Sequence, residues 1–229
     1  MTPRNQTRDR AFGSRSVRDA AGHCGLGCFR SAHFKGLARG VIQGLDQLGA
    51  RHAVIHDIKP ANVMYDPVSK EACLIDLGGL DKLSKHANTD PDVRQYPGVA
   101  LDQTRNYAGT EFTMSPRLTP NDMDPDRLGF LLSEPHGPEV DRYSGGVTLL
   151  SALAPQISSH AMVSNLSSRP IPKDTPAEQY LNILRERLHS IDPAAAQALD
   201  RRFEQEPHLE QLIHHCFLAS QPGQTGETA

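Results

Sequence analysis

The sequence contains no tryptophan, and aromatic residues make up only 5% of its 229 residues. It also lacks any apolar run near the length of about eighteen residues that a transmembrane helix needs, so we expect no membrane span. Charge of neither sign predominates, because 24 basic and 27 acidic residues give a formal net charge of −3. This balance argues against nucleic-acid binding and against attraction to an anionic membrane.

Cysteine is scarce as well, and its spacing predicts no disulfide framework. Cys24 and Cys28 have loose metal-ligand spacing, but no second pair completes a tetrahedral zinc site. Cys73 and Cys216 fall in a strand pattern and a helix pattern, where buried thiols are common. The arginine-rich amino terminus lacks the apolar stretch of a secretory signal peptide. We therefore expect a reducing, cytoplasmic location, and an export or effector role stays open.

The distribution of apolar residues predicts one helical lobe with flexible ends. Residues 1–32 are polar, rich in arginine and glycine and without period, so we predict a flexible lead-in. The lobe is predicted over 33–219, followed by a polar flexible tail over 220–229. Apolar residues at i, i+3 and i+4 predict a helix from Phe34 to the stop signal at Gly49. Further helices are predicted at 141–153, 176–191, 193–205 and 207–219.

Between the first and second of these helices, the stretches "NVMYD" and "EACLID" are short strand candidates joined by the turn "PVSK". With the turn centred between Val68 and Ser69, antiparallel pairing sets Asn62 opposite Ile75, one residue from Asp76. Residues 77–116 are predicted as a long loop and 117–140 as an extended connection, so that only helix and loop follow the hairpin. The sequence thus predicts a mainly α fold with a small β-hairpin.

The hairpin ends carry polar residues with a common chemistry. The amide oxygen of Asn62 and the carboxylate of Asp76 could converge on one small cation. Such donors, completed by water and phosphate oxygens, are how proteins usually hold Mg²⁺. Asp57 and Lys59 lie just before the first strand, as an acceptor for a hydroxyl proton beside a cation for a phosphate. This set of side chains suits phosphoryl transfer.

The same residues carry a resemblance to a known family. "HDIKPAN" followed by "LIDLGG" resembles the catalytic loop and metal-binding turn of eukaryotic-type Ser/Thr protein kinases. Three further segments follow the family's order. They resemble the helix before that loop, the end of the activation segment and the buried helix that supports the loop: "GLARGVIQGLDQLGARHAVIH", "GTEFTMSP" and "EVDRYSGGVTLLSAL". The resemblance covers Phe34 to Leu153. It implies a protein-kinase-like C-terminal lobe, a helical bundle around a catalytic-loop hairpin.

The resemblance also implies a division of the lobe. The catalytic loop would span 54–62, the metal-binding turn 76–78, the activation segment 76–117 and an insertion 117–140. The cofactors implied are ATP and Mg²⁺, and the implied partner is a protein substrate that receives the γ-phosphate on a Ser or Thr hydroxyl.

Individual roles follow from the matched positions. Asp57 would be the catalytic base, and Lys59 would contact the transferring phosphate. Asn62 and Asp76 would bind Mg²⁺. Thr110 would hydrogen-bond near Asp57 and Lys59. Asp141 would tie the backbone of the catalytic loop to the supporting helix.

Three departures from the family pattern qualify these roles. Only 33 residues precede Phe34, which leaves no room for the family's β-rich N-terminal lobe, so that lobe is absent or replaced. "GLGCF" at 25–29, with Lys35 after it, looks like a phosphate-covering loop, but we favour a flexible lead-in. His56 replaces an arginine that usually pairs with a phosphorylated activation loop, so activation by phosphorylation is not expected. Arg117 replaces the glutamate that ends the activation segment.

Several functions therefore compete. The first is a Ser/Thr protein-kinase catalytic lobe, favoured by the intact polar positions. The second is a pseudokinase or adaptor that uses the lobe as a protein-binding surface, or a truncated fragment that is inactive alone. Both follow from the missing lobe, and a second chain could cover the apolar surface left exposed. The third is a small-molecule kinase of the aminoglycoside or choline type. That group generally lacks a lysine at the position of Lys59 and a segment like "GTEFTMSP", which argues against this function.

Overall fold

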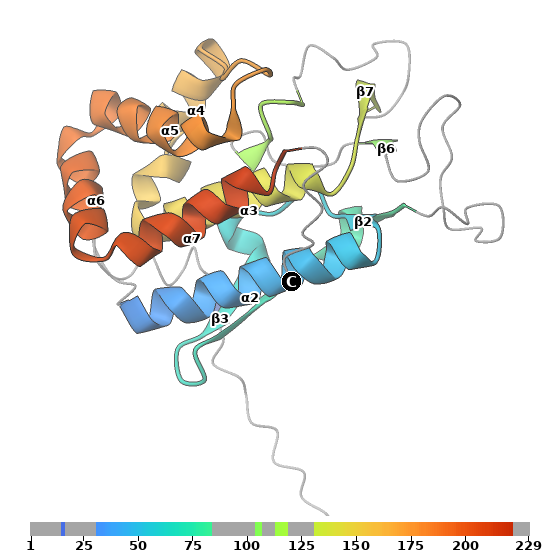
Figure 1. The fold of residues 1–229 in the computed structure, drawn as a ribbon, viewed down its shortest axis with the longest axis horizontal. Helices are drawn as coiled ribbons and strands as arrows, with labels where there is room; N and C mark the ends of the chain where they lie inside the picture. The colour runs from blue at the N-terminus through green and yellow to red at the C-terminus, as the bar shows by residue number, and fades with distance from the viewer. Residues whose placement is uncertain (1–14, 17–30, 84–103, 107–112, 119–130, 222–229) are drawn as a thin grey trace, which may run out of the picture.

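The computed structural model describes residues 15–16, 31–83, 104–106, 113–118 and 131–221 (Figure 1). This part of the chain is mainly helical, with short strands in three small antiparallel sheets. Its six α-helices are α2 (Ser31–Ala50), α3 (Glu139–Leu153), α4 (His160–Ser168), α5 (Ala177–Ile191), α6 (Pro193–Gln205) and α7 (Pro207–Leu218). None of these helices combines the length and the apolar character that crossing a bilayer requires.

The largest of the sheets is built on the predicted hairpin. β3 (Val63–Asp66) and β4 (Glu71–Leu74) pair with Val63 opposite Leu74. The next pair outward is Asn62 and Ile75, and the Ile75 amide donates to the Asn62 carbonyl at 2.9 Å. The predicted register is confirmed. The turn supports it locally, because Asp66 Oδ1 accepts from the Val68 amide at 2.9 Å.

Five predicted helices match α2, α3, α5, α6 and α7 to within a few residues. α4 was not predicted, because its nine residues include several serines, an asparagine and a valine, which are weak helix formers. The helix is stabilised by its environment instead. The Ser159 hydroxyl accepts from the Met162 amide at 3.3 Å as an N-cap, and the Met162 side chain is fully buried.

The prediction that only helix and loop follow the hairpin was wrong. β5 (Asp81–Lys82) pairs with β2 (Ala53–Val54), and β6 (Thr104–Asn106) pairs with β7 (Leu131–His136). β7 lies inside the segment predicted as an extended connection. β1 (Arg15–Ser16), within the predicted lead-in, pairs with β3. The strands of two or three residues are too short to show a period, and the sequence LLSEPH of β7 does not alternate and contains a proline.

The core is formed where α2, α3, α5 and α7 pack together. α3 and α7 cross the middle of the molecule, α2 runs along one side over the hairpin, and α4, α5 and α6 lie on the other side (Figure 1). An aromatic cluster joins three of these helices. The Tyr143 ring lies 5.1 Å from the Tyr180 ring and 5.4 Å from the Phe217 ring, centroid to centroid. Burial raises the pKa of the Tyr143 hydroxyl. The Tyr143–Tyr180 contact is edge-to-face, with an interplanar angle of 89°, and such contacts add to the stabilisation from burial.

The cysteine predictions had different outcomes. Cys216 on α7 is buried as expected, and burial raises the pKa of its thiol to about 12. Cys73 is exposed, contrary to the strand pattern, because α2 covers the other face of β4. Ala72 and Leu74 lie on that covered face and pack against the core. Cys24 and Cys28 lie outside the described residues.

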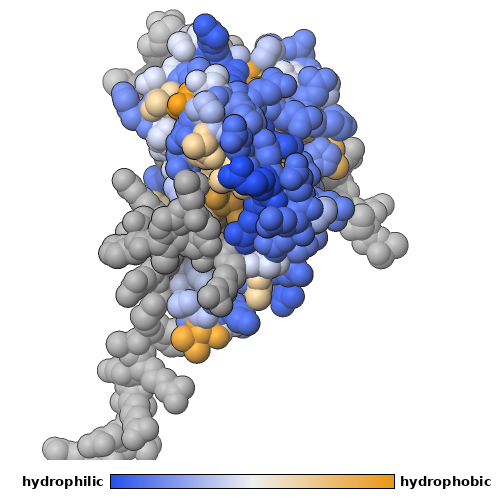
Figure 2. Space-filling model, turned by 90° about the vertical axis from the view of Figure 1, so that its left-hand side faces the viewer, coloured by the Kyte–Doolittle hydropathy of each residue, from blue (hydrophilic) through white to orange (hydrophobic). Residues whose placement is uncertain are grey.

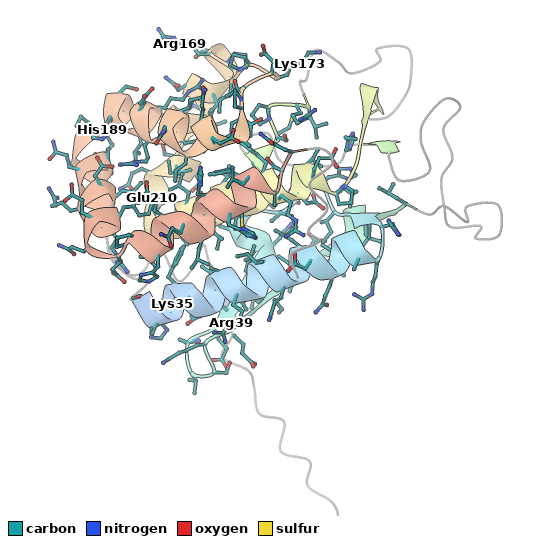
Figure 3. All side chains as sticks on the ribbon, in the orientation of Figure 1. Lys35, Arg39, Arg169, Lys173, His189 and Glu210 are labelled. Carbon is teal, nitrogen blue, oxygen red and sulfur yellow. The ribbon has the colours of Figure 1, made fainter. Side chains whose placement is uncertain are left out.

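The outer helices are joined by a charged network. Arg185 on α5 donates to Asp200 on α6 at 2.7 Å and to Glu210 on α7 at 2.9 Å, and His189 lies 2.7 Å from Asp200. Figure 3 labels two members of this network, His189 and Glu210. Partial burial raises the pKa of Asp200, but the bonds from Arg185 and His189 outweigh this, so the pKa is lowered overall. The face that carries α6 is mostly hydrophilic (Figure 2).

Glycines on α2 allow the helix to lie directly on the hairpin. Gly36, Gly40 and Gly44 are spaced by four and share one helix face. A Cβ on Gly36 would clash with the Lys70 carbonyl oxygen, and one on Gly40 would lie 2.7 Å from the Ala72 Cβ and clash with the Ala72 carbonyl. The clashing carbonyls are backbone groups, which cannot rotate away. The glycines therefore set the distance between α2 and β4.

We expect Gly40→Ala to destabilise the protein. Alanine favours a helix by about 1 kcal/mol over glycine. Overpacking costs about 1–3 kcal/mol, and because the opposing carbonyl belongs to the backbone we take the upper end, about 3 kcal/mol, which leaves a net loss of about 2 kcal/mol. Gly49→Ala, on the same helix, is the control, because its nearest neighbour is the Arg142 Nη2 atom at 3.9 Å. Urea denaturation of both variants measures the difference. A Gly40→Ala variant as stable as Gly49→Ala would contradict the close packing.

Candidate functional site

The predicted catalytic loop is anchored by α3. The carboxylate of Asp141, on the first turn of that helix, accepts from the Ile55 amide at 2.7 Å and from the His56 amide at 2.8 Å. Asp141 is 2% exposed, so both bonds are shielded from water. The sequence-based prediction that Asp141 ties the loop backbone to the helix is confirmed.

The electrostatics of Asp141 reflect a balance of two effects. Burial raises the pKa of its carboxyl group, while the amides of Ile55 and His56 lower it, and the result is a pKa of about 7. Glu139 adds a small increase and Arg142 a small decrease. The carboxyl group is therefore costly to keep charged inside the protein, and its two backbone bonds recover part of that cost.

α3 makes two further side-chain bonds that were not predicted, one to the same loop and one to a neighbouring segment. The Thr148 hydroxyl donates to the Ile58 carbonyl at 3.4 Å, which gives the catalytic loop a second attachment. The Ser144 hydroxyl donates to the Thr113 carbonyl at 2.7 Å. Thr113 and Ser115 are buried, so the end of the predicted activation segment packs against the same helix as the loop.

Three of the predicted site residues meet within the loop. Lys59 Nζ lies 2.7 Å from Asp57 Oδ2, with both side chains partly exposed. Asn62, at the end of the 3₁₀ helix η1 (Pro60–Asn62), donates its Nδ2 to Asp57 Oδ2 and to the Asp57 carbonyl, each at 2.9 Å. Pro60 at the start of η1 favours this turn. A carboxylate thus sits between an ammonium group and an amide.

The orientation of Asn62 fits the predicted metal role. Because both of its donor bonds go to oxygens of Asp57, the amide nitrogen faces Asp57, and its Oδ1 takes part in neither bond. Asp76, one residue beyond the hairpin pair of Asn62 and Ile75, is exposed and precedes the 3₁₀ helix η2 (Leu77–Gly79). Two oxygen donors at the ends of paired strands suit Mg²⁺ with water and phosphate as its other ligands. That Asn62 and Asp76 share one ion stays a prediction.

The backbone around the site is unusual. His56 and Asp76 are non-glycine residues in the left-handed region, with φ of 67° and 58°. Such residues are uncommon, and aspartate and histidine are among the types that tolerate this conformation best. Left-handed backbone at non-glycine positions costs of order 1–3 kcal/mol and is concentrated at functional sites. Both residues border the cluster of Asp57, Lys59 and Asn62.

One contact of the loop was missed altogether. The ring of His56 hydrogen-bonds the ring of His136, with 2.9 Å between their Nε2 atoms, and both residues are buried. Eighty residues separate them in the sequence, so no local spacing could have indicated the pair. Two other predictions cannot be compared: Thr110 and the "GLGCF" segment lie outside the described residues. Lys35, which follows that segment in the sequence, is exposed on α2 (Figure 3).

Apolar side chains are exposed beside the candidate metal ligand. Ile75, Leu77 and Leu80 flank Asp76 and are 37%, 51% and 37% exposed. Three exposed apolar residues so close together in the sequence are compatible with a surface that meets another molecule.

Comparison with known proteins gives a distant relation to a protein kinase. No known family profile matches the chain. Mitogen-activated protein kinase kinase kinase 8 from Rattus norvegicus is 29% identical over 110 residues, which are 48% of this chain and 18% of that protein. The chain thus spans less than a fifth of the length of this relative. The match indicates a kinase-like relation at most and says nothing about activity.

Proposed function

We propose that this chain is a kinase-like catalytic lobe that transfers the γ-phosphate of ATP to Ser or Thr hydroxyls of a protein. The observation that carries the proposal is the arrangement of Asp57, Lys59 and Asn62 on a loop anchored by Asp141. The Asp57 carboxylate contacts both of the other polar groups at 2.9 Å or less. A lobe retained only for binding has no physical need of this cluster.

The proposed chemistry assigns one task to each group. The Asp57 carboxylate, oriented by Lys59 and Asn62, accepts the proton of the substrate hydroxyl as that oxygen attacks the γ-phosphorus atom of ATP. The bond from this phosphorus to the bridging oxygen of the β-phosphate breaks, and ADP leaves. Lys59 places a positive charge next to the transferring phosphoryl group. Asn62 and Asp76 would hold Mg²⁺, which neutralises phosphate charge when bound. Positioning and charge neutralisation supply most of the catalysis in phosphoryl transfer.

A transfer assay tests this function. The purified chain is incubated with ATP labelled at the γ-phosphate and casein as a protein substrate, in Mg²⁺ and in excess EDTA. We expect labelled Ser and Thr only with Mg²⁺, and we expect Lys59→Ala to lower the rate about tenfold or more. Lys35→Ala, which removes an exposed lysine on α2, is the matched control and should leave the rate unchanged. Labelling that is equal in wild type and Lys59→Ala would point to a contaminating kinase.

The exposed apolar residues favour a second candidate. As an adaptor or pseudokinase, the chain would bind another protein chain through the surface of Ile75, Leu77 and Leu80. In the kinase proposal the same surface would face a second chain that covers the nucleotide. The transfer assay separates the kinase proposal from the adaptor proposal. If the folded chain transfers no phosphate, alone or with a captured partner, the kinase function is excluded and the adaptor function remains.

A further inference from the structure

Two histidines from distant parts of the chain meet in the interior next to the candidate site. The rings of His56 and His136 are nearly perpendicular, with centroids 5.1 Å apart and an interplanar angle of 76°. Their Nε2 atoms are 2.9 Å apart, and the residues are 2% and 4% exposed. The predicted catalytic residues gave no indication that these two histidines would meet.

The pair connects the catalytic loop with the strand that leads into α3. His56 immediately precedes Asp57, and its amide is already bound by Asp141. His136 ends β7, one residue before Gly137, whose amide donates to the Glu139 side chain at the start of α3 at 2.9 Å. His56 is therefore held on two sides, its backbone by α3 and its ring by β7.

The chemistry of the bond constrains both rings. A bond between two Nε2 atoms requires one ring to donate and the other to accept, so the rings carry different protonation at these atoms. Because water is excluded, the bond is stronger than it would be at the surface. Breaking it would deprive two buried Nε2 atoms of this hydrogen bond, which costs free energy. The contact therefore fixes the orientation of the His56 ring and restrains its left-handed backbone.

We propose that His136 is a positioning residue: its ring holds the ring of His56, and this fixes the backbone that carries the Asp57 carboxylate. The inference rests on the phosphoryl-transfer function proposed above. Under this proposal, β7 helps to set the geometry of the catalytic loop. The His56 ring then has a partner within the same chain, His136, and this contact needs no phosphorylated residue. A displacement of about 1 Å at a reacting group can cost on the order of a hundredfold in rate.

The test combines a spectroscopic readout with kinetics. In the wild-type protein labelled with nitrogen-15, we expect a through-hydrogen-bond coupling between the two Nε2 nuclei, which is lost in His136→Leu. We expect His136→Leu to lower kcat about tenfold or more with KM for ATP changed less than about twofold. His136→Gln, whose amide reaches the place of Nε2, should keep at least about half of the wild-type kcat. His160→Leu, at an exposed histidine on α4, is the control and should change neither.

Each outcome decides the inference. An absent coupling, or His136→Leu with wild-type kcat, would overturn it, as would Gln and Leu variants that are equally impaired. If His136→Leu does not fold, His136→Asn replaces it, because its shorter side chain cannot reach His56 Nε2. A wild-type protein that transfers no phosphate refutes the proposed function. A wild-type protein that transfers phosphate with an unaffected His136→Leu variant refutes the positioning role alone.

Discussion

Replacement of Asp57 by Asn is expected to lower the rate of phosphoryl transfer by about a hundredfold to ten-thousandfold, the range that a positioned general base contributes. The substitution keeps the size of the side chain but removes its charge, so it lowers the proton affinity and weakens the partly exposed ion pair with Lys59. Pairs that remain in contact with water contribute only about 0–1 kcal/mol. The amide oxygen of the new side chain can still accept from the Asn62 amide, which now donates to Asp57 Oδ2 at 2.9 Å. The loss should therefore appear in kcat, while the thermal midpoint of unfolding stays close to that of wild type.

The control for this variant is Asp174→Asn, which removes an exposed carboxylate between α4 and α5. It should transfer phosphate at the wild-type rate. Labelled-ATP transfer and differential scanning fluorimetry on the same preparations give both readouts. An Asp57→Asn variant with more than about a tenth of the wild-type rate would exclude Asp57 as the proton acceptor.

Replacement of Asp141 by Ala is expected to cost about 3–5 kcal/mol of the free energy of unfolding. It leaves two buried backbone amides, those of Ile55 and His56, without their acceptor, and each such group costs about 1–3 kcal/mol. Asp46→Ala is the matched control, because the Asp46 carboxylate is 59% exposed and makes one ion pair with Arg142 at 2.7 Å. Surface pairs of this kind contribute about 0–1 kcal/mol. Urea denaturation that shows equal losses would mean that the anchor is unimportant for stability.

The same residue gives the protein a pH dependence with a definite sign. The pKa of Asp141 is about 7 in the folded protein against an ordinary value of 3.8. Between these values the folded state binds the proton more tightly than the unfolded state. The contribution of the protonated Asp141 carboxyl group to the free energy of unfolding is therefore complete below pH 3.8 and is lost as the pH rises through about 7. Over this window it falls by about 1.4 kcal/mol per pH unit. From pH 5 to pH 8 the wild type should lose more stability than Asp141→Asn, which cannot ionise.

Much of the local structure was predictable because neighbouring residues determine it. The pairing of Asn62 with Ile75 follows from the turn at Val68 and Ser69. A slip of one residue would turn every side chain of a strand to the other face. The long helix α2 follows from its apolar period. The anchoring role of Asp141 came from a family resemblance, and its two bonds confirm it. The roles of Asp57, Lys59, Asn62 and Asp76 stay proposals.

Other features could not be read from the chain because they depend on what packs against it. The helical pattern of α2 did not indicate a role for its glycines, yet their lack of a Cβ atom decides how near β4 can lie. The strand pattern around Cys73 predicted burial, but only one face of β4 is covered. α4 forms from weak helix formers because Ser159 caps it and Met162 is buried.

The sequence by itself determined α2, α3, α5, α6 and α7, the register of the hairpin and the spacing of the polar groups on the loop, because these depend on contacts between residues a few positions apart. The tertiary structure alone decided that His136 would meet His56 and that Ser144 would hold Thr113. Those contacts join residues 80 and 31 positions apart. They form only when α3 and the segments on either side of it are packed in place, so no local pattern encodes them.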